Sequence, residues 1–360
     1  MFKDLLIYIN SFFAFLLVLS GYSVYFSPAS IWFPAFYGLA YPFLLIINII
    51  FIFLWFLWFS KKRFTLVSIA AIILTWSSFS ALFNFSMPNH SDSDISVMTW
   101  NVKNFDLYNW SHNKETHELM MQLLEKEKPD VLCLQEFYTE TSGNFKNIAE
   151  LKMRLGFKYY YFGETFSVKN GTKKWGLATF SKFPIKDHGT IKFDDNLRLN
   201  ACIYTDIAYK KDSIFRVYNV HFQSLHFADE DYKYFSELKE EQKADVASSK
   251  KILKKIRNGF EKRAIQALKI KTEMDAFEGK KLICGDFNDT PTSYTYHVLS
   301  NNMKDSFKEK GFGFGNTLVN PTPFFRIDFM LVDESITVNS YETFKKEYSD
   351  HYPVMVHLEL

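Results

Sequence analysis

The stretch Ile283-Cys-Gly-Asp-Phe-Asn-Asp289 places two carboxylates and an amide directly after an apolar run. The run, Leu282–Cys284, is typical of a buried strand. Gly, Asn and Asp are also the residues of tight turns, and Pro291 follows, so these letters alone fit a turn as well as a functional site. The ends of the other predicted strands decide between the two.

The same arrangement recurs at five further predicted strand ends, where an apolar run meets a carboxylate, an amide or an imidazole. The polar residues at these ends are Asn101, Glu136, His221, Asp328 and the pair Asp350-His351, in addition to Asp286 and Asn288. Each residue alone also fits an ordinary structural role, such as a turn residue, a surface carboxylate, a buried histidine or, for Asp328, an ion pair with Arg326.

Taken together, these side chains suit acid–base and metal chemistry. Carboxylate and amide oxygens are the ligands that Mg²⁺ and Mn²⁺ prefer, and the cluster of Cys and His expected for structural zinc is missing from the sequence. Two histidines near carboxylates suit proton transfer and phosphate contact near neutral pH.

The first 86 residues have the composition of a membrane domain. Three apolar stretches, at about 5–26, 36–59 and 64–85, are each long enough to cross a hydrocarbon core of roughly 30 Å as a helix. A cleaved signal peptide has a single short apolar core, so three such stretches favour three transmembrane helices in a lipid bilayer.

The charges around these stretches predict an orientation. Lys3 precedes the first stretch, and Lys61, Lys62 and Arg63 lie between the second and the third. Positive residues favour the cytoplasmic side. We therefore expect a multi-pass membrane protein with a cytoplasmic N-terminus and an extracytoplasmic domain after the third helix.

A polar linker, 87–94, leads into a region with alternating strand and helix patterns, 95–360. The predicted helices are Thr116–Lys128 and Ala149–Leu155, and the predicted strands are Ile95–Trp100, Val131–Leu134, Tyr159–Phe162, Leu177–Phe180, Ala201–Asp206, Ile214–Val220, Lys281–Cys284, Ile327–Val332 and Val354–Leu358. This mixture favours a layered α/β domain. The three cysteines, Cys133, Cys202 and Cys284, all fall in apolar runs, which predicts buried free thiols.

One segment of this region, 236–281, is helix-like and highly charged, with 13 basic and 8 acidic residues. Asn258-Gly259 predicts a break between two helices. The segment fits either an outer cover of a sheet or a basic surface facing anionic lipid or nucleic acid. Of the chain's 42 basic and 40 acidic residues, 38 and 39 follow residue 86, which argues against a strongly basic nucleic-acid binder.

From Ile95 onward the sequence resembles the endonuclease/exonuclease/phosphatase superfamily. The motifs, in chain order, are TWNVKNF (99–105), LCLQE (132–136), GLATFSKFPI (176–185), YNVHF (218–222), CGDFND (284–289), RIDF (326–329) and SDHYPV (349–354). The resemblance implies a four-layer α/β sandwich, in which two packed mixed sheets are flanked by helices and the site lies at one edge. The charged segment at 236–281 is long for a nuclease-like member.

The resemblance also implies a role for each polar strand end. Glu136 matches the principal Mg²⁺ ligand, with Asn101 nearby and Asp350 at the position of a further acidic residue of the metal site. Asp286 matches the residue that orients or deprotonates the attacking water, and Asn288 the residue that holds a phosphate oxygen. His351 would contact the scissile phosphate, with its ring oriented by Asp328, and His221 would act as general acid or phosphate ligand.

These expectations describe a membrane-anchored, Mg²⁺- or Mn²⁺-dependent hydrolase of phosphodiesters or phosphomonoesters. The sequence names no protein partner. A catalytically inactive binding or scaffold module on the same fold is the alternative from another class. Within the enzyme interpretation, a nuclease and a sphingomyelinase-like phospholipid phosphodiesterase both stay open, with an inositol phosphatase as a third choice.

Overall fold

The computed structural model describes residues 2–57, 62–86, 93–193, 200–210, 213–225, 246–319 and 325–360. These residues form two compact units. The helical unit comprises the described residues within 1–78, 223–268 and 292–297, and the sandwich unit comprises those within 79–222, 269–291 and 298–360. The greater part of the expected linker, the first ten residues of the charged segment (236–245) and Lys61 lie outside the described residues.

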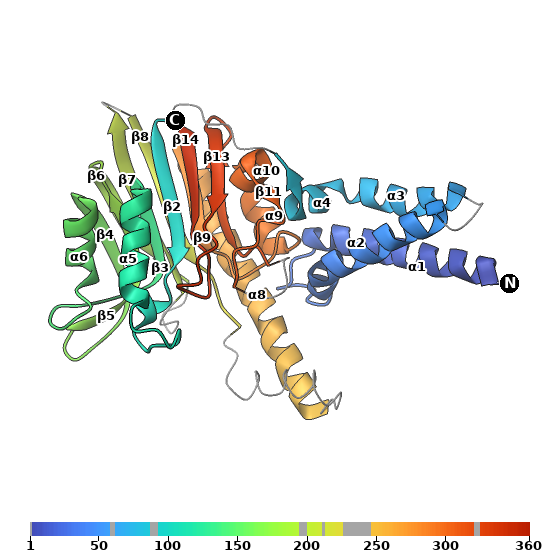
Figure 1. Ribbon diagram of the computed structural model, residues 1–360, viewed down its shortest axis with the longest axis horizontal. Coiled ribbons are helices and arrows are strands. Elements are labelled where there is room, and N and C mark those ends of the chain that lie inside the picture. Colours follow the sequence, from blue (N-terminus) through green and yellow to red (C-terminus); the bar gives the residue numbers. More distant parts are fainter. Residues whose placement is uncertain are drawn as a thin grey trace. The chain divides into compact units, whose positions relative to one another are not determined.

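The sandwich unit contains two six-stranded sheets (Figure 1). The order of parallel and antiparallel neighbours is the same in both. The first sheet has the order β13 (Thr337–Thr343), β14 (Val354–Glu359), β2 (Ile95–Asn101), β3 (Val131–Glu140), β5 (Lys173–Ser181) and β4 (Tyr159–Val168). The second has the order β10 (Met303–Asp305), β12 (Asp328–Asp333), β9 (Lys280–Asp286), β8 (Ser213–His221), β7 (Ala201–Lys210) and β6 (Ile185–Lys192). In each sheet the two central strands are parallel and all other neighbours are antiparallel.

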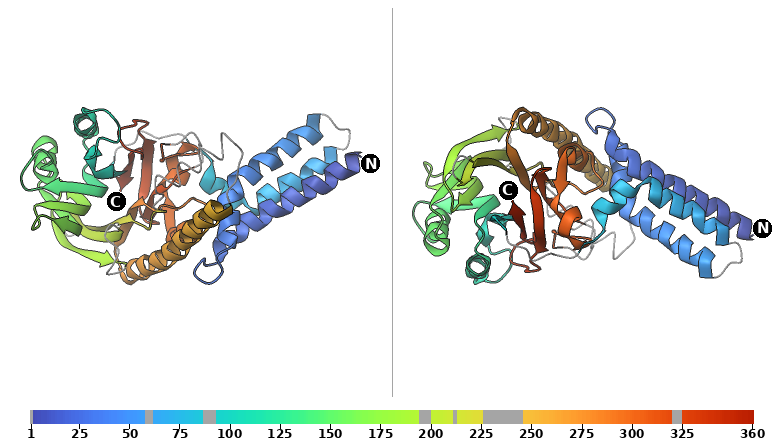
Figure 2. Two further views of the ribbon diagram at one scale, coloured as in Figure 1. Left: turned by 90° about the horizontal axis from the view of Figure 1, so that it is seen from below. Right: turned by 90° about the horizontal axis from the view of Figure 1, so that it is seen from above.

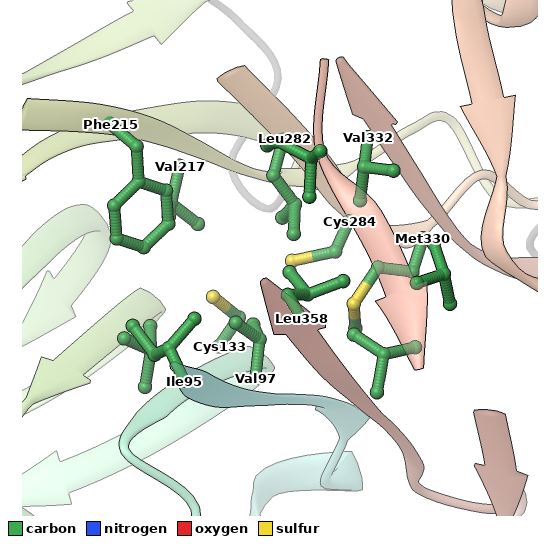
Figure 3. Packing of buried hydrophobic residues seen from close by; sticks show 14 of the residues in the cluster. Ile95, Val97, Cys133, Phe215, Val217, Leu282, Cys284, Met330, Val332 and Leu358 are labelled. Carbon is green, nitrogen blue, oxygen red and sulfur yellow. The ribbon is translucent and has the colours of Figure 1, made fainter. Parts of the chain in front are cut away.

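The two sheets face each other across an apolar core (Figure 3). Val217, Leu282 and Cys284 from the second sheet lie opposite Val97 and Cys133 from the first, and all are fully buried. Successive side chains of a strand point to opposite faces, so every second residue of these strands can enter this core. The three cysteines are buried and free, as the sequence predicts.

Helices cover the outer faces of both sheets. On the first sheet, α5 (Thr116–Glu127) and α6 (Asn147–Leu155) bury Met120, Leu124 and Leu151 in a second apolar cluster. On the second sheet, the Tyr218 hydroxyl of β8 donates to the Glu273 carbonyl of α8. The predicted layered α/β fold of two mixed sheets with flanking helices is therefore confirmed.

The short elements complete the chain. They are η1 (Ser23–Tyr25), η2 (Lys62–Phe64), β1 (Asn84–Phe85), η3 (Lys103–Asp106), α9 (Tyr294–Ser300), α10 (Ser306–Lys310) and β11 (Phe312–Gly313). Of these, β1 and β11 pair with each other as a separate two-stranded sheet.

The structure of the N-terminal helices differs from the expectation of three continuous transmembrane helices. Two helices, α1 (Phe2–Tyr22) and α2 (Pro34–Leu57), are long and apolar enough to span a membrane. The expected third span is a pair, α3 (Thr65–Leu74) and α4 (Trp76–Leu82), and with η2 before α3 it bends by 76°. At the break the Thr75 hydroxyl bonds back to the Ala71 carbonyl at 2.9 Å, a contact that competes with the backbone ladder and bends helices.

Polar side chains join the helices α1, α2 and α3, which lie side by side (Figure 2). Asn48 on α2 donates to the Phe13 carbonyl on α1 at 3.1 Å, and Ser68 on α3 donates to Asn10 on α1 at 3.1 Å. Buried hydrogen bonds of this kind are a common way for helices to associate in an apolar solvent. The bundle is thus suited to a bilayer.

The described part of the charged segment contains one continuous helix across the expected break. Helix α8 runs without interruption from Val246 to Ala276, so the expected break at Asn258-Gly259 is wrong. Gly259 is buried, and a Cβ atom there would lie 2.7 Å from the Leu225 side chain. The glycine therefore serves close packing within the helix and does not end it.

The partner of Arg326 is Asp305 and not the neighbouring Asp328 that its sequence position suggests. The two guanidinium NH₂ groups of Arg326 donate to the Asp305 carboxylate at 3.1 and 2.7 Å, and one of them also donates to the Ala81 carbonyl at 2.9 Å. The exposed fractions of the two charged side chains are 0% and 2%. A pair buried to this degree leaves an uncompensated charge when either member is removed.

We expect Asp305→Asn to lower the free energy of unfolding by about 3–5 kcal/mol, because the Arg326 guanidinium then stays buried without its counter-ion. The measurement is denaturant unfolding followed by circular dichroism. As a control, Lys126→Ala removes a solvent-exposed partner of Glu127 and should leave the unfolding midpoint unchanged. Equal stability of Asp305→Asn and the wild type would contradict the structural role of this pair.

Candidate active site

The shared strand pattern brings the polar strand ends to one edge of the sandwich. The carboxyl ends of the parallel pairs β2/β3 and β8/β9 lie there together with the beginnings of the antiparallel strands β12 and β14. In the second sheet Asp286 is the register partner of both His221 on β8 and Asp328 on β12. The sheet ladder itself thus aligns three of the predicted residues in one row.

Glu136 reaches this edge from inside a strand, because β3 continues to Glu140 and does not end at Leu134 as its apolar run suggests. The pairing of β3 with β5 shifts between Leu134 and Phe137, and Glu136 has a positive φ of 47°. Such a bulge redirects one side chain out of the ladder. The strand end expected from the sequence is in fact a bulge that presents the Glu136 carboxylate.

Asn101 connects the two carboxylates of the site. Its amide nitrogen donates to Glu136 at 3.3 Å and to Asp286 at 3.1 Å, while its amide oxygen accepts from the Lys103 backbone N–H at 3.1 Å. The Ser349 hydroxyl donates to the Asn101 backbone carbonyl at 2.7 Å. Asn101 therefore holds Glu136 and Asp286 close to each other through its NH₂ group.

His351 and Asp328 form a buried pair. Nδ1 of His351 lies 2.9 Å from the Asp328 carboxylate, and its Nε2 lies 3.7 Å from the Asp286 carboxylate. Burial alone would lower the pKa of His351, but the charges of Asp328 and Asp286 outweigh burial and hold the pKa well above its ordinary value. Burial raises the pKa of Asp328, against the opposing effect of the His351 charge.

His221 faces the same carboxylates from β8. Its Nε2 lies 3.7 Å from Glu136 and 3.6 Å from Asp286, too far for a good hydrogen bond. The ring is 3% exposed, and within the described part of the chain neither of its nitrogens has a hydrogen-bond partner. Buried polar atoms without a partner are rare in folded proteins, and a catalytic role or a contact with water or an ion explains them.

The CGDFND stretch is a tightly fixed turn as well as part of the site. The Asn288 backbone N–H donates to the Asp286 carboxylate at 2.8 Å, and the Asn288 side chain donates to the Phe222 carbonyl at 3.1 Å. Asn288 has a φ of 51°, which asparagine tolerates better than most residues. Gly285 has a φ of 132°, and a Cβ atom there would lie 2.1 Å from the Val220 carbonyl oxygen, so β8 and β9 can approach only at a glycine.

Asp350 lies at the margin of the site. Its carboxylate pairs with Lys103 at 2.8 Å and accepts from the Ser349 hydroxyl at 3.2 Å. Burial would raise its pKa, but the charges of His351 and Lys103 outweigh burial and lower it. Asp350 is thus linked to Asn101 through Ser349, whereas Glu136 contacts Asn101 directly.

The site residues suit a hard divalent cation. Asp286, Asp328 and His351 each offer a ligand atom within 4.8 Å of the others, but Asp328 and His351 are already bonded to each other. Glu136 and Asp286, held next to each other by the Asn101 amide, supply the oxygen ligands that Mg²⁺ or Mn²⁺ prefers. A cation there would also offset the mutual repulsion of these carboxylates.

Some residues that build the site carry no signal in the sequence. The Thr317 hydroxyl accepts from the Ile327 and Asp328 backbone N–H groups at 2.9 and 3.0 Å and so fixes the start of β12. Thr317 lies outside every strand pattern and motif, so only the structure reveals it. Lys103 and Ser349, in contrast, lie inside motifs that the sequence shows.

A protein-family model matches the region of the chain that contains the site. The model described as "Endonuclease/Exonuclease/phosphatase family" matches residues 98–351. A second model, "Domain of unknown function (DUF8431)", matches residues 3–82. A search of the curated proteins found no match to this chain.

Solved structures share the fold of the sandwich unit. An endonuclease/exonuclease/phosphatase from Bacteroides vulgatus has 19% identity and a TM-score of 0.54, with 74% of this chain and 98% of that chain covered. A mannosyl-6-phosphatase of Bacteroides thetaiotaomicron has 17% identity and a TM-score of 0.53, with coverage of 74% and 100%. A protein from Beutenbergia cavernae has 15% identity and a TM-score of 0.54, with coverage of 75% and 72%.

The pairing of His351 with Asp328 can be tested without a substrate. Asp328→Asn removes the larger of the two charges that raise the pKa of His351, so the pKa should fall. We would follow the His351 ring by NMR in histidine-labelled, metal-free protein. His297, half-buried in the helical unit, serves as the control and should titrate identically in both proteins. An unchanged His351 titration would contradict the assigned pairing.

The raised pKa of His351 also makes the stability of the fold depend on pH. A histidine whose pKa is raised by folding stabilises the fold fully below its unfolded value of 6.5, and this contribution is lost as pH rises through the folded pKa. The contribution of His351 to the free energy of unfolding of the wild type should therefore disappear as the pH rises through the folded pKa of His351. Asp328→Asn should reduce that pH dependence.

Proposed function

Because the chain belongs to the endonuclease/exonuclease/phosphatase family, whose members are generally metal-dependent hydrolases of phosphoric esters, we propose that it hydrolyses a phosphoric ester at the Asp286 edge of its sandwich. The observation that carries the proposal is the buried arrangement of Asp286 between two imidazoles, with His221 at 3.6 Å and His351 at 3.7 Å. A carboxylate flanked by two rings suits attack of water on phosphorus.

Asp286 is the group that prepares the attacking water. One carboxylate oxygen accepts from the Asn288 backbone and the other from the Asn101 amide, which fixes its orientation. A water molecule hydrogen-bonded to this carboxylate is aligned with a phosphorus atom that approaches the open edge. Positioning of this kind contributes much of the rate in reactions at phosphorus.

The two histidines stabilise charge and move protons. His351, held protonated by Asp328 and Asp286, places positive charge where the phosphoryl oxygens become more negative. His221, with ring nitrogens that have no hydrogen-bond partner in the described residues, is placed to protonate the leaving oxygen. A divalent cation bound at Glu136 would act as a Lewis acid on a phosphoryl oxygen.

The substrate class that we propose is a phosphodiester or phosphomonoester outside the bilayer. The long apolar helices α1 and α2, together with the bent pair α3 and α4 as a third crossing, would anchor the chain. With three crossings, an N-terminus on the cytoplasmic side leaves the catalytic residues on the opposite side. A nucleic acid, a phospholipid head group and a sugar phosphate are the three substrates to compare. The last follows from the name of the structurally similar mannosyl-6-phosphatase.

We expect Asp286→Asn and His351→Ala each to lower kcat by roughly 10²–10⁴-fold, because each removes a group that acts in the transition state. The assay measures turnover by the full-length protein with Mg²⁺ or Mn²⁺ on plasmid DNA, RNA, a phospholipid panel, mannose 6-phosphate and a bis-aryl phosphodiester. His357→Ala is the matched control, since His357 lies on β14 and contacts Ser93. It should keep wild-type turnover.

The outcomes of this assay separate the two classes of function. Metal-dependent turnover that both variants lose supports the enzyme, and the preferred substrate distinguishes a nuclease from a lipid or sugar phosphate hydrolase. A folded wild-type protein that binds Mg²⁺ and turns over none of these substrates would support an inactive binding module instead.

Removal of the metal gives an independent prediction. Chelation with EDTA should abolish turnover, and added Mg²⁺ should restore it. Glu136→Gln removes one anionic ligand. It should raise the Mg²⁺ concentration needed for half-maximal activity by roughly 10–100-fold, the range found when residues that support a metal site are replaced. The control Glu127→Gln, on the surface helix α5, should leave this concentration unchanged. Full activity in EDTA would refute the metal requirement.

A further inference from the structure

The first part of helix α8, within the helical unit, combines basic and apolar side chains on its exposed surface. Between Val246 and Leu268 the sequence has seven basic residues, of which Arg263 is buried, and one acidic residue, Glu261. Large apolar side chains are nevertheless exposed along the same stretch, namely Val246, Leu253, Ile265 and Leu268. Basic residues next to exposed apolar residues are the signature of a helix that lies in a membrane interface.

A groove of about 630 Å³ runs between this helix and the end of the α1–α2 connection together with the first turn of α2. All of its lining residues belong to the helical unit. One wall is aromatic, with Trp32, Phe33, Phe36 and Tyr37, and the other combines apolar and polar groups, with Leu253, Lys254, Arg257 and Asn258. The groove is therefore apolar over most of its surface and carries positive charge along one side.

Contacts within the unit hold the two walls in place. The Arg257 guanidinium lies 5.0 Å from the centre of the Trp32 ring, and Phe36 packs edge-on against Phe260 of α8 at 5.3 Å. The Arg257 Nε–H donates to Glu261 at 2.7 Å, and the Arg257 side chain is 46% exposed. The guanidinium is thus oriented by an aromatic ring and a carboxylate, yet its surface is open to a ligand.

The groove lies at the end of the membrane helices, where aromatic residues are concentrated. Tyr22, Tyr25, Phe26, Trp32 and Tyr37 are all exposed near the connection between α1 and α2. Trp and Tyr gather at the level of lipid head groups, because their rings are apolar and their edges are polar. This places the groove at the depth of phosphate and glycerol groups in a bilayer.

We propose that this groove binds an anionic phospholipid of the surrounding membrane. The negatively charged phosphate contacts Lys254 and Arg257, and the glycerol and upper acyl chain lie against Trp32, Phe33 and Leu253. Charge complementarity and continuity with the apolar helices identify this occupant, since a soluble anion would leave the aromatic wall exposed to water. The inference rests on the proposed membrane insertion of α1 and α2 and not on catalysis.

The test is native mass spectrometry of the full-length chain, purified in detergent and mixed with phosphatidylglycerol and phosphatidylcholine of identical acyl chains. We expect the wild type to bind phosphatidylglycerol preferentially. A basic residue near an anionic lipid surface contributes roughly fivefold in affinity, so Lys254→Gln combined with Arg257→Gln should weaken phosphatidylglycerol binding about 25-fold. Phosphatidylcholine binding should change little.

Lys262→Gln is the matched control, because it removes one exposed positive charge from the same helix outside the groove. It should keep the wild-type preference for phosphatidylglycerol. All these side chains are exposed, so the variants should melt at the wild-type temperature. Equal binding of the two lipids by the wild type, or equal losses in the control and the double variant, would overturn the proposal.

Three further measurements separate the possible failures. Resistance of the protein to alkaline carbonate extraction tests membrane insertion by itself. If insertion holds and the lipid preference is absent, the groove proposal fails alone. Complete displacement of phosphatidylglycerol by soluble glycerol phosphate would also overturn it, because the aromatic wall would then contribute nothing. Turnover of a soluble bis-aryl phosphodiester should be the same in the double variant and the wild type.

Discussion

The hydrogen bond from Asn101 to Asp286 is the contact on which the site depends, because it joins the two sheets at the edge where the polar strand ends meet. Asn101 ends β2 in one sheet and Asp286 ends β9 in the other. Deeper in the sandwich, the Gln135 amide donates to Asn219 at 2.7 Å and again crosses from sheet to sheet. These buried polar contacts fix the relative alignment of the sheets, since an apolar interface alone tolerates sliding.

The repeated strand pattern explains why residues far apart in sequence converge. Each sheet has a central parallel pair whose carboxyl ends point to the same edge, and an antiparallel neighbour that begins there. This geometry brings together three strand ends, the bulge inside β3 and two strand starts. Side chains on rigid strands hold their positions better than side chains on loops, which suits chemistry at phosphorus.

The sequence predicts the central strands well because they depend on strong local signals, and the same signals point to the polar residues that the structure brings together at one edge. Val131–Leu134 and Leu282–Cys284 are apolar runs with no polar interruption, and polar residues directly follow them. The outer strands β6 and β13 were not predicted, since their half-exposed sequences, such as Thr337–Thr343, are mostly polar. The bulge at Glu136 depends on the pairing of β3 with β5, a tertiary contact that local patterns do not contain. At the bend, the Thr75 hydroxyl contacts Tyr41 of α2 in addition to its local bond to Ala71, and the contact with Tyr41 is also invisible to local patterns.

The three buried cysteines have a consequence for where such a domain can fold. The thiolate is the form that reacts with oxidants and disulfides, and burial raises the pKa of the Cys202 and Cys284 thiols. Once the sandwich has closed, all three cysteine side chains are shielded from solvent, and the raised pKa of Cys202 and Cys284 also disfavours their thiolate forms. The folded domain should thus need neither a disulfide catalyst nor a reducing environment, and its stability should be the same on either side of a membrane whose two faces differ in redox potential.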